Sequence, residues 1–420
     1  MITASIDFGT TNSVVGINRD GKIEMVTLGK SSLETKTVLF YSFEDREFYV
    51  GDDALDELKM ETLGRYLVAL KSFLGASENI ETTLGTTTYL LSDLISIILR
   101  RFKRVLEKHA GARIDRVVLG RPVHFNDTDT FLDQQAQNRL ESAVLQAGFK
   151  EVVFQYEPIA AALSYEKTIT KEELILVADI GGGTTDYTII RVGDNQNKID
   201  RKEDILATHG TYVGGNSFDA EIIKSFVVEH LGKGSLYKNM GKEMEIGPAL
   251  YSDFSEWHKF QKMYDVKVLN TIEKFIFMTY DKEKISRLLE LIKEGLYFSF
   301  SEKIIEAKMD LSFNDSTIID MDMFYKPFEE PLEREAFTAV ISYHIEKIKA
   351  TLDETMQMAN IGYSQIDRVF LTGGSTLVPA VKNIYKELFS EEKLVHTDVF
   401  SSVGYGLAIY AGEVWKEVSD

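Results

Sequence analysis

The sequence of 420 residues contains no cysteine and only six prolines. Without cysteine the chain forms neither a disulfide framework nor a thiolate nucleophile, and this composition fits a reducing compartment. No proline-rich or glycine- and serine-rich linker divides the chain. We therefore expect domains that are interleaved by crossovers rather than joined end to end.

Long apolar runs and an excess of basic residues are also missing. No run approaches the length of about 20 apolar residues that spans a membrane, and residues 1–5 lack the features of a signal peptide. Lys and Arg number 47 against 66 Asp and Glu, which gives a formal net charge of −19. Nucleic acids and anionic membranes bind basic surfaces, so neither is an expected partner. These absences predict a cytoplasmic protein.

Several catalytic and nucleotide-binding motifs are absent. The seven histidines have no pair at helical or finger spacing, so no zinc site is expected. No Gly-x-Ser-x-Gly elbow is present. A Walker A loop would need glycine where Glu24 stands, and a dinucleotide fingerprint that began at Gly181 would need glycine where Asp186 stands. Covalent acyl transfer and these two phosphate-binding loops are therefore excluded.

The sequence does contain three adjacent glycines, Gly181, Gly182 and Gly183, between two strand-like runs. Residues 173–178 are apolar and residues 187–192 are apolar and β-branched, so the glycines are expected at the tip of a hairpin. Without Cβ atoms they can adopt positive φ and bring backbone N–H groups close to an oxyanion. Asp179 precedes this turn, and Thr184 adds a hydroxyl donor.

An earlier stretch repeats this order. Two units of strand, aspartate, turn and strand predict two similar lobes that offer their turns to one ligand. The turns would bind phosphates, and the two aspartates would hold a hydrated Mg²⁺ between them. The earlier unit consists of Asp7, Gly9, Thr10, Thr11 and Asn12, followed by the strand-like residues 13–17.

Two later turns are also rich in glycine. Gly214, Gly215 and Asn216 precede a predicted helix, whose free N–H groups offer a third phosphate contact. Gly373, Gly374 and Ser375 follow a short strand and allow close approach of a flat group. By themselves, Lys71 is typical of a solvated surface lysine and Glu157 of a carboxylate at a helix N-terminus. Gly404 and Gly406 suggest tight packing between helices.

Periodicity predicts the remaining elements. Alternating apolar and polar residues indicate strands, and apolar residues at helical spacing indicate helices. Strands are expected over residues 5–17, 22–28, 37–50, 116–120, 152–156, 317–323 and 368–371. Helical segments are expected over residues 52–74, 93–109, 130–147, about 220–305 including 243–258, and 331–358.

These motifs, in this order, resemble the nucleotide-binding half of the 70-kDa heat-shock (Hsp70) chaperones, within the actin-like ATPase superfamily. The resemblance implies an α/β fold of the actin-like ATPase (ribonuclease H-like) type, with two similar lobes, each a mixed β-sheet flanked by helices, and inserted subdomains. Lobe I would be residues 1–178, with an insert at about 30–114 and a connector helix. Lobe II would be residues 179–420, with a helical insert at about 220–305 and the adenosine motif, and the nucleotide cleft would lie between the lobes. The matching segments are residues 6–13, 118–127 with Glu157 and Pro158, 179–186, 213–219, 307–312, 371–379 and 404–408.

The resemblance also implies ATP or ADP and Mg²⁺ as ligands. Asp7 and Asp179 would hold Mg²⁺ through water, while Lys71 and Glu157 would position the attacking water. Met309 stands where the family has an arginine that stacks on adenine, and Ile305 where it has a glutamate. The expected phosphate contacts are Gly9, Thr10, Thr11, Asn12, Gly181, Gly182, Gly183 and Thr184, and the expected adenosine contacts are Lys308, Ser312, Gly373, Gly374 and Ser375.

The function implied is a chaperone-like conformational switch that binds ATP and hydrolyses it slowly. A protein partner would read the nucleotide state, and the peptide-binding domain of the family is expected to be absent because the sequence stops after its last predicted helix. Two alternatives on the same fold stay open. One is a small-molecule kinase whose helical insert shapes an acceptor pocket, and the other is an actin-like ATPase that forms filaments.

Overall fold

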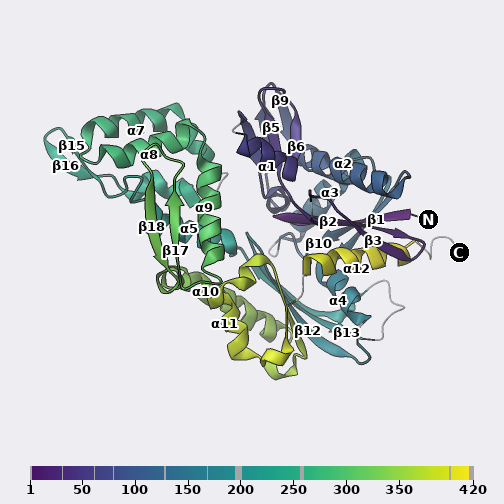
Figure 1. Cartoon of the computed structure of the whole chain (residues 1–420). Coiled ribbons are helices and arrows are strands. Elements are labelled where there is room, and N and C mark those ends of the chain that lie inside the picture. Colours follow the sequence, from purple (N-terminus) through teal and green to yellow (C-terminus); the bar gives the residue numbers. More distant parts are fainter. Residues whose placement is uncertain are drawn as a thin grey trace. The chain divides into compact units, whose positions relative to one another are not determined.

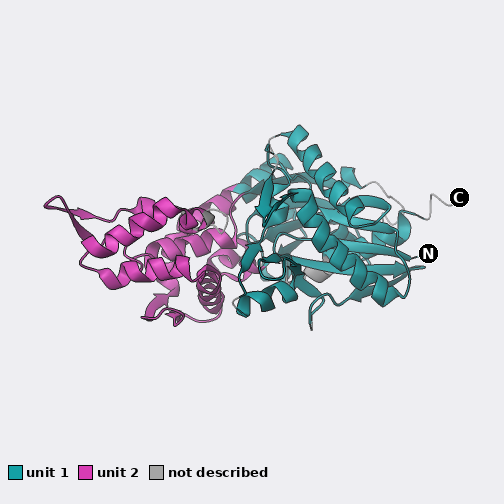
Figure 2. Ribbon diagram, turned by 90° about the horizontal axis from the view of Figure 1, so that it is seen from above, with its two compact units in different colours: residues 1–211, 351–373, 386–420 teal, residues 212–350, 374–385 magenta. Residues whose placement is uncertain are grey.

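Two compact units make up the part of the chain that the structure, a computed structural model, describes (Figure 2). Unit 1 comprises residues 1–211, 351–373 and 386–420, and unit 2 comprises residues 212–350 and 374–385. The chain thus passes between the units repeatedly, as expected from its lack of a linker. The predicted lobes divide the chain at a different place and stay a prediction. The described residues are 2–30, 32–60, 62–78, 80–126, 129–167, 169–193, 201–255, 260–396 and 399–415.

Unit 1 contains two mixed sheets with the same strand arrangement. In the first sheet β3, β2 and β1 are antiparallel neighbours, and β10 and β11 continue parallel to β1, while β4 pairs with β2. In the second sheet β14, β13 and β12 are antiparallel, and β19 and β20 continue parallel to β12. The hairpins β1–β2 and β12–β13 occupy equivalent places, so both predicted hairpins are confirmed.

The strands of these sheets have the following bounds. The first sheet is built from β1 (Ile2–Phe8), β2 (Asn12–Arg19), β3 (Lys22–Val26), β4 (Glu34–Lys36), β10 (Arg116–Arg121) and β11 (Glu151–Tyr156). The second sheet is built from β12 (Glu173–Ile180), β13 (Thr185–Val192), β14 (Ile205–Thr211), β19 (Arg368–Thr372) and β20 (Leu394–His396).

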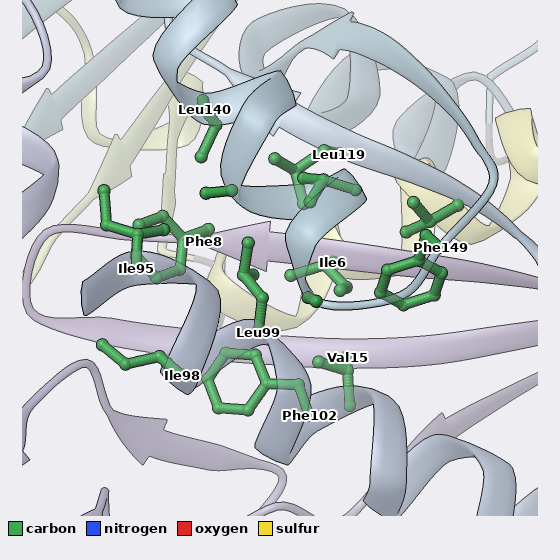
Figure 3. Packing of buried hydrophobic residues seen from close by; sticks show 14 of the residues in the cluster. Ile6, Phe8, Val15, Ile95, Ile98, Leu99, Phe102, Leu119, Leu140 and Phe149 are labelled. Carbon is green, nitrogen blue, oxygen red and sulfur yellow. The ribbon is translucent and has the colours of Figure 1, made fainter. Parts of the chain in front are cut away.

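One face of the first sheet carries the largest hydrophobic core. Side chains alternate between the faces of a strand, so Ile6 and Phe8 point to one side together with Leu119, where α2 (Leu91–Ala110) and α3 (Thr130–Gln146) cover them (Figure 3). The apolar stripe of α2 includes Leu99 and Phe102, both fully buried. This core fixes β1 rigidly, and the end of β1 carries Asp7.

Two helices lie between the sheets (Figure 1). α12 (Val399–Glu413) packs on the first sheet, α4 (Glu157–Glu166) packs on the second, and the helices contact each other. Their approach is close, because a Cβ at Gly406 would lie 1.7 Å from the carbonyl oxygen of Ala160 in α4. A Cβ at Gly404 would lie 3.0 Å from Val14 Cγ1 of β2, so Gly404 packs on the first sheet. The predicted tight contact with another helix is confirmed for Gly406, whereas Gly404 contacts strands.

The insert of unit 1 corrects one prediction. The segment 52–74 was expected to be helical, but only α1 (Asp52–Lys59) is an α-helix. After it, β7 (Gly64–Leu67) pairs with β5, and the 3-10 helix η1 (Leu70–Phe73) follows. Gly64 packs directly against the Phe40 ring, since a Cβ there would lie 2.2 Å from it, and this contact favours the strand. The other strands here are β5 (Leu39–Ser42), β6 (Phe48–Val50), β8 (Glu81–Leu84) and β9 (Thr87–Leu90).

Unit 2 is largely helical but contains two hairpins, β15–β16 and β17–β18, of which periodicity predicted only the strand β17, as residues 317–323. Within the expected helical segment of about 220–305, β15 (Leu236–Asn239) and β16 (Lys242–Glu245) form a hairpin, whose turn residues Met240 and Gly241 both have positive φ. Of the expected helical residues 243–258, only 243–245 lie in this hairpin, and residues 248–255 form the 3-10 helix η4. Residues 256–259 lie outside the described residues. Pro331, expected to begin a helix, lies in β18, an edge strand that tolerates proline.

The helical elements of unit 2 agree with the expected helical insert. They are α5 (Gly215–Ile222), the π-helix η3 (Ile223–Val227), the 3-10 helices η4 (Pro248–Ser255) and η5 (Gln261–Tyr264), α7 (Val266–Met278), α8 (Lys282–Lys293) and α9 (Tyr297–Asp310). They are followed by β17 (Ser316–Met321), β18 (Phe328–Glu333), α10 (Arg334–Met358), whose last residues belong to unit 1, η7 (Gly374–Leu377) and α11 (Pro379–Leu388). Within the described ranges, no helix has both the length and the apolarity needed to cross a membrane.

Candidate functional site

Asp7 and Asp179 lie near the ends of the equivalent central strands β1 and β12, each just before its hairpin turn. Burial raises the pKa of Asp7 to about 8, and the negative charges of Glu157, Asp179 and Glu34 act in the same direction, against Lys71. Burial and the charge of Glu157 raise the pKa of Asp179 to about 6. The two predicted Mg²⁺ aspartates are thus parts of one electrostatic cluster in unit 1.

Lys71 and Glu157 form an ion pair in the same cluster. The distance from Lys71 Nζ to Glu157 Oε1 is 2.7 Å, and only 9% of the Lys71 side chain is exposed, so it is not the solvated lysine that its local sequence suggested. Burial acts to lower the pKa of Lys71, but the charges of Glu157, Asp7 and Asp179 together raise it. Lys71 is therefore a fixed cation facing three carboxylates.

Local structure explains how these two side chains are presented. Glu157 is the first residue of α4, directly after β11, and Gly120 leaves room for it, because a Cβ there would lie 3.3 Å from Glu157 Cγ. Lys71 lies in η1, which begins after Ala69, a non-glycine residue with φ 55. A positive φ at alanine is strained, and such strain is typical of functional sites.

The cluster fits a hydrated divalent cation. Three carboxylates face one ammonium group, and the pKa of both aspartates is raised although Lys71 opposes the shift. A cation would offset this excess of negative charge. Over the described ranges, no three His, Cys, Asp or Glu residues stand close enough to ligate an ion directly. Mg²⁺ keeps several of its waters readily, so the residues present suit binding through water.

The glycines of the two turns differ in what the fold requires of them. A Cβ at Gly9 would lie 2.2 Å from the carbonyl oxygen of Asn12, so the first turn itself demands glycine. A Cβ at Gly181 would meet nothing closer than 3.7 Å, and one at Gly183 nothing closer than 3.9 Å. The positive φ considered for the glycine triplet is absent from it. The fold therefore does not require glycine at positions 181 and 183, and the space beside both residues is open.

Gly373 and Thr372 join the cluster from β19. Gly373 has φ 84, and a Cβ there would lie 2.2 Å from the Ile180 carbonyl oxygen and 3.0 Å from Asp179 Oδ1. The Thr372 hydroxyl donates a hydrogen bond to Asp179, which opposes the rise in the pKa of that carboxyl. Sequence reasoning missed Thr372, because its role depends on the pairing of β12 with β19.

The remaining predicted contacts lie in unit 2. Gly214 caps α5, and Gly215 and Asn216 are its first residues. Lys308 Nζ lies 2.8 Å from an Asp219 carboxylate oxygen and donates to the Gly215 carbonyl oxygen at 3.1 Å, so α9 is tied to the start of α5. Ser312 donates to the Lys308 carbonyl oxygen at 3.4 Å, Met309 is 58% exposed, and Gly374 and Ser375 lie in η7.

The phosphate-turn residues of unit 1 have these surroundings. The Thr11 carbonyl oxygen accepts from Thr37 N at 2.8 Å. The Thr184 carbonyl oxygen accepts from Gly181 N at 2.9 Å, which closes the second turn. Thr10 and Gly182 are half-buried, and Asn12 begins β2. The structure therefore brings Asp7, Asp179, Lys71, Glu157 and Gly373 together in unit 1, beside these two turns.

Comparison with known proteins gives consistent similarities. The family model described as Hsp70 protein matches residues 3–238 and 271–419. The chain is 27% identical to the chaperone protein DnaK of Thermosipho melanesiensis over 99% of this chain and 60% of that protein. It is 27% identical to DnaK of Ureaplasma parvum over 100% of this chain and 59% of that protein, and 25% identical to dnaK of Cyanophora paradoxa, over 99% and 61%. The chain thus spans about 60% of the length of these relatives.

Proposed function

The chain belongs to the Hsp70 family and has the actin-like ATPase fold, and from that premise we propose that it is a conformational switch that binds Mg-ATP and hydrolyses it slowly. The observation that carries the proposal is the cluster of Asp7, Asp179 and Glu157 around Lys71, of which Asp7 and Lys71 are buried. Buried charges of this kind, with shifted pKa values beside open glycine turns, mark functional sites.

Each residue of the cluster has a role in this proposal. Asp7 and Asp179 would hold a hydrated Mg²⁺, which would neutralise charge on the phosphates. Lys71 and Glu157, whose Nζ and Oε1 atoms lie 2.7 Å apart, would position the attacking water. Catalysis of phosphoryl transfer rests mainly on such positioning and on electrostatic stabilisation. The charge placement here supports both.

The turns would bind the phosphates and adenosine. Open space at Gly181 and Gly183 lets backbone N–H groups approach phosphate oxygens, and the N-terminus of α5 at Gly214 to Asn216 offers a further contact. For adenosine we propose Lys308, Ser312, Gly373, Gly374 and Ser375. Met309, in place of the stacking arginine, would weaken or retune the hold on adenine. A protein partner would read the nucleotide state, which needs an affinity difference of a few kcal/mol between states.

The test is phosphate release from Mg-ATP by the full chain, with nucleotide binding measured in parallel by calorimetry. Asp179→Asn is the test variant, and Asp322→Asn, at a carboxylate that is 63% exposed, is the matched control. We expect slow release by the wild type and the control, and loss of Mg-dependent binding in Asp179→Asn. Unchanged Mg-ATP affinity in Asp179→Asn would refute the site. Absence of nucleotide binding by the wild type would refute the switch.

The same assay separates the two alternatives. Phosphate transfer that requires an added small-molecule acceptor would indicate a kinase. An increase in light scattering that depends on nucleotide and on protein concentration would indicate filament formation.

A further inference from the structure

An arginine on α3 holds the backbone that follows Lys71. Arg139 Nη1 donates to the carbonyl oxygen of Leu74 at 2.6 Å and to that of Ala76 at 2.7 Å, and Nη2 donates to that of Glu78 at 3.2 Å. Three carbonyl groups of one short segment thus converge on a single guanidinium. Charge-assisted hydrogen bonds of this type are about twice as strong as neutral ones.

This segment continues directly from η1, the 3-10 helix that contains Lys71. Leu74 N donates to the Lys71 carbonyl oxygen at 3.1 Å, and Ala76 N donates to that of Phe73 at 3.2 Å. On the other side of η1, Ala69 has φ 55. A strained residue of this kind persists only where its surroundings hold it. The guanidinium contacts supply such a hold at the C-terminal end of η1.

The same helix also organises the loop before α3. Arg121 Nη2 lies 2.9 Å from Asp133 Oδ2, and Phe125 N donates to Asp133 Oδ1 at 2.5 Å. This loop lies against the Lys71 segment, since a Cβ at Gly75 would lie 2.6 Å from the Phe125 carbonyl oxygen. The guanidinium of Arg121 lies 5.3 Å from the centre of the Tyr156 ring, and Tyr156 directly precedes Glu157 in the chain.

α3 therefore contacts the segment that follows Lys71 and, through Arg121, the residue that precedes Glu157, without contributing to the ion pair. Its Arg139 contacts the segment after Lys71, and its Asp133 orders the loop that contacts that segment. Asp133 also pairs with Arg121 of β10, whose guanidinium lies over the Tyr156 ring. Neither the sequence motifs nor the matched segments assign a role to Arg139. Among the described residues, the Arg139 guanidinium donates its hydrogen bonds to backbone carbonyls rather than to a carboxylate.

We infer that Arg139 is a positioning residue for Lys71: it holds the carbonyls of Leu74, Ala76 and Glu78, and so keeps η1 in the place from which Lys71 reaches Glu157. This inference rests on the proposed hydrolysis for its effect on rate, but its structural part stands independently. Arg139 itself touches neither substrate nor the reacting atoms.

The rate experiment is a double-mutant cycle between Arg139→Gln and Lys71→Ala, measured as single-turnover phosphate release. Displacement of a positioned group by about 1 Å can cost roughly a hundredfold in rate, so we expect Arg139→Gln to slow release by about 10- to 100-fold. Its affinity for Mg-ATP should change by less than about threefold. In the Lys71→Ala background, Arg139→Gln should have no further effect, because residues that act through one group are not additive.

Two further variants define the comparison. Arg139→Lys keeps the charge and should restore part of the rate, as its single ammonium can reach one or two of the carbonyls. Arg100→Gln is the matched control, since Arg100 Nη2 donates to the Gln146 carbonyl oxygen at 3.1 Å, at the other end of α3. Its rate should equal that of the wild type. An equal slowing by Arg139→Gln with and without Lys71 would overturn the inference.

Hydrogen exchange separates this inference from the proposed function. In the nucleotide-free protein, Arg139→Gln should speed amide exchange within residues 70–78 by at least about tenfold, while residues of α2 keep wild-type rates. Unchanged exchange at 70–78 would overturn the inference even if the protein hydrolyses ATP. A wild type that releases no phosphate would refute the proposed function, whereas faster exchange in the variant would still support the positioning of η1 by Arg139.

Discussion

The hairpins β1–β2 and β12–β13 occupy equivalent places in two sheets with the same strand arrangement, yet the surroundings of their aspartates differ. The pKa of Asp7 is raised to about 8 and that of Asp179 to about 6. Asp7 experiences the charges of Asp179 and Glu34 as well as that of Glu157, whereas Asp179 receives a hydrogen bond from Thr372. Equivalent backbone thus carries two carboxylates with different pKa values, because side chains from other elements, such as Glu34 and Thr372, differ around them.

The turns after the two aspartates differ in the same way. Gly9 is required by its own turn, where a Cβ would lie 2.2 Å from Asn12 O, while Gly181 is open to 3.7 Å. The first turn needs glycine for its own backbone, whereas the second does not, and the space beside Gly181 is available for the proposed phosphate contact. This difference leads to the following predictions, which begin with the largest expected effect.

Alanine substitutions separate the two turns. Gly9→Ala should lower the free energy of unfolding by about 1–3 kcal/mol, because its Cβ would overlap the backbone carbonyl of Asn12 in the same turn. Gly181→Ala should leave the melting temperature unchanged but weaken Mg-ATP binding by roughly tenfold, equal to about 1.4 kcal/mol. Thermal melting and calorimetry measure both quantities. Equal losses of stability in the two variants would contradict the distinction.

The two aspartates should give two windows of pH dependence. An unfolded aspartate ionises near pH 4, whereas folded Asp7 keeps its proton until about pH 8 and Asp179 until about pH 6. Folding therefore binds protons in these windows, so the free energy of unfolding falls as pH rises, by up to about 1.4 kcal/mol per pH unit for one proton. Between pH 6 and 8 the loss should come from Asp7.

Thermal unfolding measured against pH, in buffers with a chelator and without nucleotide, tests this pH dependence of stability. Between pH 6 and 8, Asp7→Asn should flatten the dependence. Asp179→Asn should narrow the pH range over which stability falls without removing the fall, because burial is the largest cause of the raised pKa of Asp7 and the charge of Asp179 is a smaller one. The same slope in wild type and Asp7→Asn would show that Asp7 is ionised at neutral pH.

The smallest effect is expected from Thr372→Val, which makes Asp179 more like Asp7. Loss of the hydroxyl removes a hydrogen bond that favours the ionised carboxyl. A hydrogen bond of about 0.5–1.5 kcal/mol corresponds to a rise of up to about one unit in the pKa of Asp179. Carboxyl ¹³C chemical shifts followed against pH measure it. An unchanged or lowered pKa would contradict the assigned role of Thr372.

The sequence was sufficient to predict those structural features that depend on the residue types of one short segment. The glycine triplet between two apolar runs predicted the hairpin β12–β13, and its repetition predicted β1–β2. The glycines of α12 likewise predicted close helix packing, because only a residue without a side chain permits a contact such as that of Gly406 with Ala160. The resemblance to Hsp70 proteins named the family that the comparison then showed.

Features that depend on distant pairing could not be read from the sequence. Thr372 meets Asp179 only because β19 pairs with β12, and Arg139 meets the Lys71 segment only because α3 packs beside it. The prediction of a helix over residues 52–74 was wrong because short segments show too little periodicity: β7 spans Gly64–Leu67 and η1 spans Leu70–Phe73, each shorter than two helical turns. The burial of Lys71 follows from this fold rather than from its neighbours in the chain.

The contact of α12 with the first sheet has a consequence for how the protein is made. Thr3 Oγ1 donates to the Ala411 carbonyl oxygen at 3.0 Å, and the Asn18 amide donates to that of Ala408 at 2.9 Å. At a synthesis rate of about 5–20 residues per second, β1 waits roughly 20–80 s before α12 exists to cover it. A nascent chain with an uncovered sheet face is prone to aggregate. We therefore expect the nascent chain of this protein, itself a member of a chaperone family, to be prone to aggregation until α12 has been synthesised.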